Sequence, residues 1–203
     1  MNSTTPLLQI TDLHFAYPPD VVVFKAWSTQ LAPGLTVVCG DESCGKTTLL
    51  RLLAGELQGR GRITLDNAPL RPEHVFWQDP RAAPDDTTAS AYLAAQALRW
   101  PAWDEAAAQA HIDGLSLREH LHKPMFALST GGRRKTWLTA ALASGAPLTL
   151  MDEIFAALDT ASIRYLGAAL AQAASTPDRW LLAAHWDALP GVPTSQVLRL
   201  ERP

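Results

Sequence analysis

The spacing of apolar and polar residues predicts strands in the first part of the chain. Residues 7–17 and 21–31 alternate almost regularly, which is typical of antiparallel strands with one face in solvent. Residues 35–39 (LTVVC) are continuously apolar, which favours a central strand buried on both faces. A leucine-rich helix is predicted from Lys46 to Ala54, before Gly55. Two further strands are predicted at residues 62–66 (RITLD) and 74–78 (HVFWQ).

The pattern changes to a helical one at Asp79. Residues 79–128 are rich in alanine, arginine and glutamate and are broken by proline and glycine, which predicts an inserted helical block. A helix at about 130–144, a buried strand at 148–152 with a helix after it, and a strand at 180–185 follow. This alternation predicts an α/β fold with a mainly parallel sheet. We therefore expect one domain over residues 1–203, with a core that includes an antiparallel β part (about 1–78 and 129–203) and a helical subdomain (about 79–128).

The stretch GDESCGKTT follows the apolar strand directly and opens the helix. It fits the P-loop pattern G-x-x-x-x-G-K-T, in which backbone N–H groups and the positive helix end bind phosphate. Asp41 and Glu42 occupy variable positions, so their side chains can point away from the phosphate. The candidate nucleotide-binding residues of this loop are Gly40, Asp41, Glu42, Ser43, Cys44, Gly45, Lys46, Thr47 and Thr48.

A second candidate site is LTLMDE, residues 148–153, an apolar strand that ends in two acids. We expect this strand to lie beside the P-loop, because a magnesium nucleotide requires a carboxylate there. Asp152 would hold Mg²⁺ through water, and Glu153 would orient or deprotonate the attacking water. The two acids could instead cap the following helix. Their combination with a P-loop favours the magnesium nucleotide.

The motifs along the chain, taken in order, resemble those of the ATP-binding cassette (ABC) ATPases. The matching residues are Tyr17 (stacking on adenine), Gly40 to Thr47 (Walker A), Gln78 (Q-loop), LSTGGRRK from Leu128 (signature), Asp152 and Glu153 (Walker B and catalytic glutamate), Asp159 (D-loop) and His185 (switch histidine). The resemblance covers nearly the whole chain. It implies a P-loop NTPase with a RecA-like core, and an ATP-hydrolysing subunit that energises a membrane transporter.

The resemblance also implies partners and site roles. Two cassettes would pair head to tail, most simply as a homodimer, and the helical block would dock on a transmembrane permease encoded separately. ATP would lie between one P-loop and the second cassette's Ser129 and Gly131. The catalytic residues would be Lys46, Glu153 and His185, and the Mg²⁺ ligands Thr47, Gln78 and Asp152.

The signature departs from the usual family pattern L-S-G-G-Q. Thr130 stands at its third position, Gly132 replaces the glutamine, and Ile154 replaces the proline that usually follows the catalytic glutamate. A degenerate cassette that binds ATP in a structural or regulatory role therefore stays an alternative, although the retained Glu153 and His185 disfavour it. A non-transport cassette acting on nucleic acid or ribosomes is a further alternative. Such proteins usually have two cassettes or long insertions, which this sequence lacks.

The acids of the P-loop suggest a hypothesis about the paired cassettes. Asp41 and Glu42 would face the second cassette's signature helix and meet Arg133 or Arg134, which would make closure of the pair salt-dependent. The alternative is that these acids are solvated and that residues 133–135 form an ordinary solvated helix face.

Composition adds limits rather than a function. The 203 residues carry a net charge of −3 with a pI near 6.0, so charge does not indicate a nucleic-acid partner. No apolar run approaches the length of a membrane span, and the N-terminus does not resemble a signal peptide, so we expect no direct membrane insertion. We expect a cytoplasmic protein, peripheral on the inner face of the membrane through its permease. Its size resembles the short cassettes of haem-exporter type.

Overall fold

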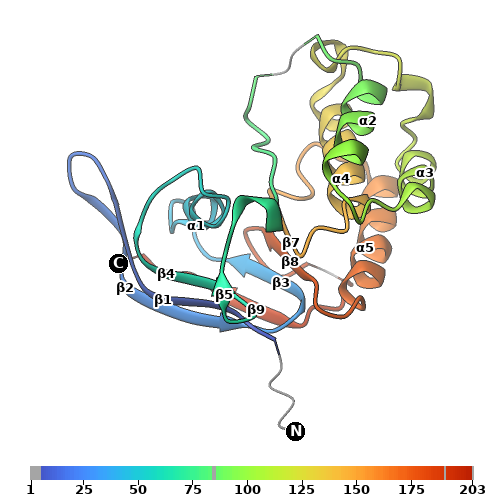
Figure 1. Ribbon diagram of the computed structural model, residues 1–203. Helices are drawn as coiled ribbons and strands as arrows, with labels where there is room; N and C mark the ends of the chain where they lie inside the picture. Colours follow the sequence, from blue (N-terminus) through green and yellow to red (C-terminus); the bar gives the residue numbers. More distant parts are fainter. Residues whose placement is uncertain (1–5, 84–85, 190, 203) are drawn as a thin grey trace, which may run out of the picture.

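The computed structural model describes residues 6–83, 86–189 and 191–202. Two β-sheets lie on either side of one helix, α1 (Lys46–Leu53), and further helices cover the opposite face of the second sheet (Figure 1). This arrangement confirms the predicted α/β fold with a parallel sheet and an antiparallel part.

The first sheet is antiparallel, in the order β2-β1-β4-β5. Its strands are β1 (Leu8–Tyr17), β2 (Val21–Leu31), β4 (Arg60–Leu65) and β5 (Ala68–Pro69). Leu8 and Ile10 of β1 are buried and Thr11 and Asp12 are exposed, so one face packs inward as the alternating pattern predicts. The hairpin of β1 and β2 extends beyond the rest of this sheet (Figure 1).

The second sheet is parallel, in the order β6-β7-β8-β3-β9. Its strands are β6 (Val75–Phe76), β7 (Leu148–Asp152), β8 (Trp180–Ala184), β3 (Gly34–Cys39) and β9 (Gln196–Arg199). Every residue of β3, β7 and β8 is buried. Successive residues of β3 serve different cores: Val38 packs with α1 and the antiparallel sheet, and Val37 packs with the helices of the opposite face. A continuously apolar strand is required for this double burial.

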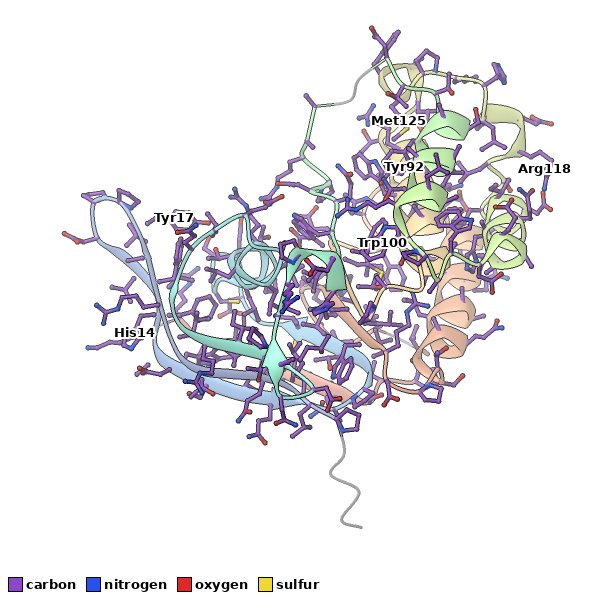
Figure 2. The ribbon with its side chains drawn as sticks, viewed as in Figure 1. His14, Tyr17, Tyr92, Trp100, Arg118 and Met125 are labelled. Carbon is purple, nitrogen blue, oxygen red and sulfur yellow. The ribbon has the colours of Figure 1, made fainter. Side chains whose placement is uncertain are left out.

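The remaining helices lie on the far side of the parallel sheet (Figure 1). They are α2 (Ala89–Arg99), α3 (Glu105–Gly114), α4 (Thr130–Ala143) and α5 (Thr160–Ala174), with short 3₁₀ turns at Arg118–His120 and Met125–Ala127. A further 3₁₀ turn, Pro72–His74, lies between β5 and β6. Leucines of α4 and α5 cover the sheet, while α2 and α3 pack around Trp100 in a third core. Figure 2 places Tyr92, Trp100 and Met125 within this helical part.

The sheets differ from the sequence prediction in three respects. The predicted strand 74–78 is only two residues long, because the chain leaves the sheet after Phe76. Strands β5 and β9 were not predicted, since both are short and become strands through pairing with β4 and β3. Finally, β8 lies between β7 and β3, an order of strands that the sequence did not predict.

Candidate active site

The carboxyl ends of β7, β8 and β3 bring three distant motifs to one edge of the parallel sheet. Asp152 ends β7, His185 follows β8, and the loop 40–45 follows β3. A cavity of about 610 Å³ opens at this edge, as expected for ligand sites of α/β sheets. It is lined by Glu42, Lys46, Thr47, Asp152, Glu153, Phe155, Ala156, Ala184, His185 and Trp186.

The loop owes its shape to two glycines in the left-handed region. Gly40 has φ 145° and Gly45 has φ 100°. A Cβ atom on Gly40 would lie 2.3 Å from the carbonyl oxygen of Leu200, and one on Gly45 would lie 2.6 Å from Cγ1 of Val23. Gly45 also caps α1 without any side-chain hydrogen bond from the described residues, which leaves the first N–H groups of α1 available to an anion.

The side chains of the loop follow the sequence prediction. Asp41, Glu42 and Ser43 are exposed, while Cys44 is a buried free thiol. The Lys46 ammonium folds back along the loop, donating hydrogen bonds to the carbonyl oxygens of Gly40 at 2.7 Å and Asp41 at 2.8 Å. Two carbonyl acceptors of the loop therefore hold the Lys46 ammonium, while the side chains of Asp41 and Glu42 are exposed.

Thr47 and Asp152 supply adjacent oxygen atoms inside the cavity. The Thr47 hydroxyl donates to Oδ2 of Asp152 at 2.7 Å, and the Arg81 guanidinium lies 3.7 Å from the same oxygen. Burial raises the pKa of the Asp152 carboxyl, and the Thr47 hydrogen bond and the charge of Arg81 oppose this rise. The described residues contain no cluster of three histidine, cysteine or acidic ligands. One hydroxyl and one carboxylate do fit Mg²⁺, which prefers oxygen ligands and completes its shell with water and phosphate.

Glu153 adopts an unusual backbone conformation beside this pair. Its φ is 48°, in the left-handed region that side chains other than glycine rarely adopt. Its side chain is 70% exposed, although the neighbouring Asp152 is buried. The turn thus separates two successive acids, one pointing into the protein beside Thr47 and one pointing out at the cavity.

His185 is fixed between two aromatic rings. Its imidazole lies 5.6 Å from the Phe155 ring and 5.3 Å from the Trp186 ring, centroid to centroid. Nδ1 is 3.0 Å from the carbonyl oxygen of Asp187, and this contact is a hydrogen bond only when Nδ1 carries the proton, because a carbonyl only accepts. The Asp187 N–H lies 3.4 Å from the same Nδ1 and donates to it in the other tautomer, which places the proton on Nε2.

Tyr17 and Gln78 lie outside the lining of the cavity, as do several residues of the P-loop stretch: Gly40, Asp41, Ser43, Cys44, Gly45 and Thr48. Tyr17 sits at the end of β1 near α1 (Figure 2), with its hydroxyl 3.3 Å from that of Thr48. Gln78 lines a separate cavity of about 30 Å³ together with Asp152, and its Oε1 accepts a hydrogen bond from the Tyr92 hydroxyl at 3.4 Å.

The signature residues also lie outside the cavity of their own chain. Ser129 caps α4, and its hydroxyl accepts a hydrogen bond from the Gly132 N–H at 3.0 Å. Gly131 packs against the carbonyl of Ala157. Ser129 is thus exposed and Gly131 half-buried at the start of a helix, and neither lines the 610 Å³ cavity.

Both expectations for Arg134 were wrong: its side chain is available neither to the P-loop acids of a second cassette nor to solvent. Arg134 is buried, and it binds the main chain of Asp152 and Glu153. Arg133 remains half-buried and bonds to the Leu128 carbonyl. Burial could not be read from a basic run, because it depends on what α4 packs against.

The sequence analysis also did not identify three side chains that lie at the cavity or against Asp152. Phe155 and Trp186 line the cavity, and Arg81 lies against Asp152. The only available signal was proximity, since each lies within three positions of a predicted site residue.

Comparison with known proteins identifies the family. A family model described as "ABC transporter" matches residues 24–156, which is more than half of the chain. The chain belongs to the ABC transporter family. This ABC protein is accordingly an ATP-binding and ATP-hydrolysing subunit, of the kind that energises transport, as the resemblance implied.

Curated relatives of this ABC protein serve different transporters. It is 29% identical to a cytochrome c biogenesis ATP-binding export protein, CcmA 1, of Cupriavidus metallidurans, with 97% of this chain and 99% of that one aligned. It is 33% identical to the corresponding protein of Sphingopyxis alaskensis, over 82% and 84% of the two chains. It is 34% identical to the taurine import ATP-binding protein TauB of Pseudomonas fluorescens, covering 75% of this chain but 61% of that one.

Solved structures share the fold of this ABC protein. A putative ABC transporter ATP-binding protein from Pyrococcus furiosus superposes with a TM-score of 0.78 at 18% identity, covering 96% of this chain and 97% of the other. A bacterial Atm1-family ABC exporter with ATP bound gives 0.79 at 18% identity, covering 99% and 38%. These likenesses confirm the predicted P-loop NTPase fold. Among the described residues, none of the helices is both long enough and apolar enough to cross a bilayer.

Proposed function

We propose that the 610 Å³ cavity is the ATP hydrolysis site and that its predicted residues act there in the roles given by the family. The observation that carries this proposal is that Lys46, Thr47, Asp152, Glu153 and His185, taken from three separate segments, all line one cavity. Such convergence of a phosphate loop, two acids and a histidine is what phosphoryl transfer to water requires.

The phosphates would bind at the start of α1. The N–H groups of α1 and the Lys46 ammonium supply the positive charge there, and the ammonium already lies over the loop. Thr47 and Asp152 would hold Mg²⁺, with Gln78 as a further ligand. When bound, Mg²⁺ would neutralise charge on the phosphates during transfer.

The attack of water would depend on Glu153 and His185. The exposed Glu153 carboxylate can orient a water molecule or accept its proton. With Nδ1 accepting from the Asp187 N–H, His185 carries its proton on Nε2 and can donate it in a hydrogen bond to an oxygen of the terminal phosphate. The rings of Phe155 and Trp186 both lie against the imidazole at the cavity.

Steady-state ATP hydrolysis by the purified chain tests these roles. Glu153→Gln should abolish most of the hydrolysis while ATP still binds, because the amide cannot accept the proton. Glu119→Gln, a change of the same kind at an exposed acid of the helical part, is the matched control and should retain the native rate. A Glu153→Gln variant that hydrolyses ATP like the control would contradict the proposal.

We further propose that two copies close the site head to tail. Ser129 and Gly131 lie outside their own cavity, which supports a role at a second copy's nucleotide. Trp186 is 74% exposed at the cavity, and a second copy would cover it. Light scattering on Glu153→Gln should show a doubling of mass on addition of ATP, and a monomer at saturating ATP would count against pairing.

The transporter itself is proposed by analogy with the full-length relatives. A separate permease would hold the subunit at the cytoplasmic face of the membrane, with residues 79–128 as the helical subdomain that contacts it. The third core packs this block, through Trp100 and its neighbours, against Phe76 and the alanines of α4. Because the alignment with the cytochrome c biogenesis protein spans both chains, we propose an export role of that type.

Deletion of the chain in its own host tests the transport role. Loss of c-type cytochromes, restored by the native sequence but not by Glu153→Gln, is the expected result. Normal cytochromes with loss of growth on taurine would instead indicate an importer like the second group of relatives.

A further inference from the structure

Arg134 is a buried arginine that holds the backbone next to the proposed catalytic glutamate. It lies in the second turn of α4 and is only 6% exposed. Its Nη1 donates to the carbonyl oxygen of Asp152 at 2.9 Å and to that of Glu153 at 2.6 Å. Its Nη2 lies 4.0 Å from Oε2 of Glu153.

These two carbonyls are a special pair, because they belong to the peptide groups on either side of the Glu153 Cα atom. The orientations of those two peptide planes define φ and ψ of Glu153, and φ and ψ define where its side chain leaves the backbone. One guanidinium nitrogen therefore holds the backbone conformation of Glu153. This conformation needs support, since φ of 48° is unfavourable for a residue with a side chain.

The contact is unlike ordinary packing. Burial lowers the pKa of Arg134, and the charges of Glu153 and Asp152 oppose this shift. Its buried Nε also lacks a hydrogen-bond partner among the described residues. An apolar side chain of the same length would avoid both penalties but would leave the two carbonyls without their donor.

We infer that Arg134 is a positioning residue for ATP hydrolysis: it holds Glu153 in its left-handed conformation and so aims the carboxylate at the cavity. Arg134 touches neither nucleotide nor water in this role. Its action depends on the role proposed above for Glu153. Ser129 caps the same helix and Gly131 lies in its first turn, so Arg134 also connects these signature residues to Glu153 of the same chain.

Arg179 provides a matched control. It is also buried, at 9% exposed, and its Nη2 donates to two successive carbonyls, those of Ala141 at 3.0 Å and Leu142 at 3.1 Å. Its Nε likewise lacks a partner among the described residues. However, Arg179 holds the last turn of α4, at the end away from Glu153.

The experiment compares kcat and KM for ATP in Arg134→Met, Arg134→Lys, Arg179→Met and Arg179→Lys, with thermal unfolding of each. Arg134→Met should lower kcat by roughly tenfold or more and leave KM within about twofold, because only a transition-state interaction is lost. Arg134→Lys keeps one donor group and should recover part of kcat. The Arg179 variants should lose similar thermal stability and keep the native kcat.

Several outcomes would overturn the inference. The first is a kcat equal to that of the native chain in both Arg134→Met and Arg134→Lys. The second is an equal loss of kcat in the Arg134 variants and the Arg179 variants, which would mean that Arg134 has a merely structural role. A raised KM with unchanged kcat would assign Arg134 to nucleotide binding instead. If Arg134→Met does not fold, the two lysine variants decide the question. Glu153→Gln, assayed alongside, separates the proposals: hydrolysis retained there would refute the role of Glu153 itself.

Discussion

Substitution of Gly131 by alanine probes the contact between the signature helix and the loop that leads to Asp159. A Cβ atom at position 131 would lie 2.4 Å from the carbonyl oxygen of Ala157, a distance that real Cβ atoms essentially never show. The neighbour is backbone, so the loop or the helix must move. At Gly132, by contrast, a Cβ atom would meet its nearest neighbours, Leu128 and Ser129, at an ordinary 3.4 Å.

The two variants therefore differ mainly in this clash. Alanine in place of glycine within a helix gains roughly 0.5–1 kcal/mol at either position. Overpacking at position 131 should cost about 1–3 kcal/mol, and none is expected at position 132. Gly132→Ala should thus stabilise the protein slightly, and Gly131→Ala should be less stable than Gly132→Ala by about 1–3 kcal/mol, which corresponds to about 2–12 °C in Tm for a chain of this length.

Urea and thermal unfolding of the two variants and the native chain, followed by circular dichroism, give the comparison directly. The unfolding free energies come from one linear extrapolation protocol, and equal m-values would show that the unfolded states are comparable. If Gly131→Ala is as stable as Gly132→Ala, the carbonyl of Ala157 does not lie against the start of α4, and the reasoning fails.

Three further predictions concern stability, pH and metal binding. Burial lowers the pKa of His111, so the unfolded chain binds a proton at this side chain more readily than the folded chain does. The free energy of unfolding should therefore fall as pH drops below 6.5. His111→Gln should remove that part of the pH dependence in urea titrations at several pH values. Leu150→Ala, in the buried strand β7, should cost about 2–5 kcal/mol, whereas Leu98→Ala, at 90% exposed, should be nearly neutral in the same assay. Asp152→Asn should raise Tm, because it removes a buried carboxylate. The same variant should lose the effect of Mg²⁺ on ATP binding in calorimetry, and an unchanged Mg²⁺ dependence would contradict the role of Asp152 as a ligand.

The sequence predicted those helices and strands that carry a clear apolar pattern of their own. The apolar run at 35–39 and the strand 148–152 appear as β3 and β7, and the leucines after Lys46 form α1. Short strands such as β5 and β9 were missed, because two to four residues carry too little periodicity and are stabilised by a neighbour. The order of strands was also beyond the sequence, since hydrophobic pattern shows that a strand is buried but not which strand lies beside it.

The chain by itself determined the family, the fold class and the motif residues, because phosphate binding and water activation require particular residue types at particular spacings. Only the tertiary structure decided how those residues are held. It inserted β8 between β7 and β3, placed Phe155 and Trp186 around His185, and buried Arg134 beneath Glu153. Burial and contact across the chain depend on how whole elements pack, and a run of basic residues looks the same in sequence whether it faces water or the main chain of the turn at Glu153.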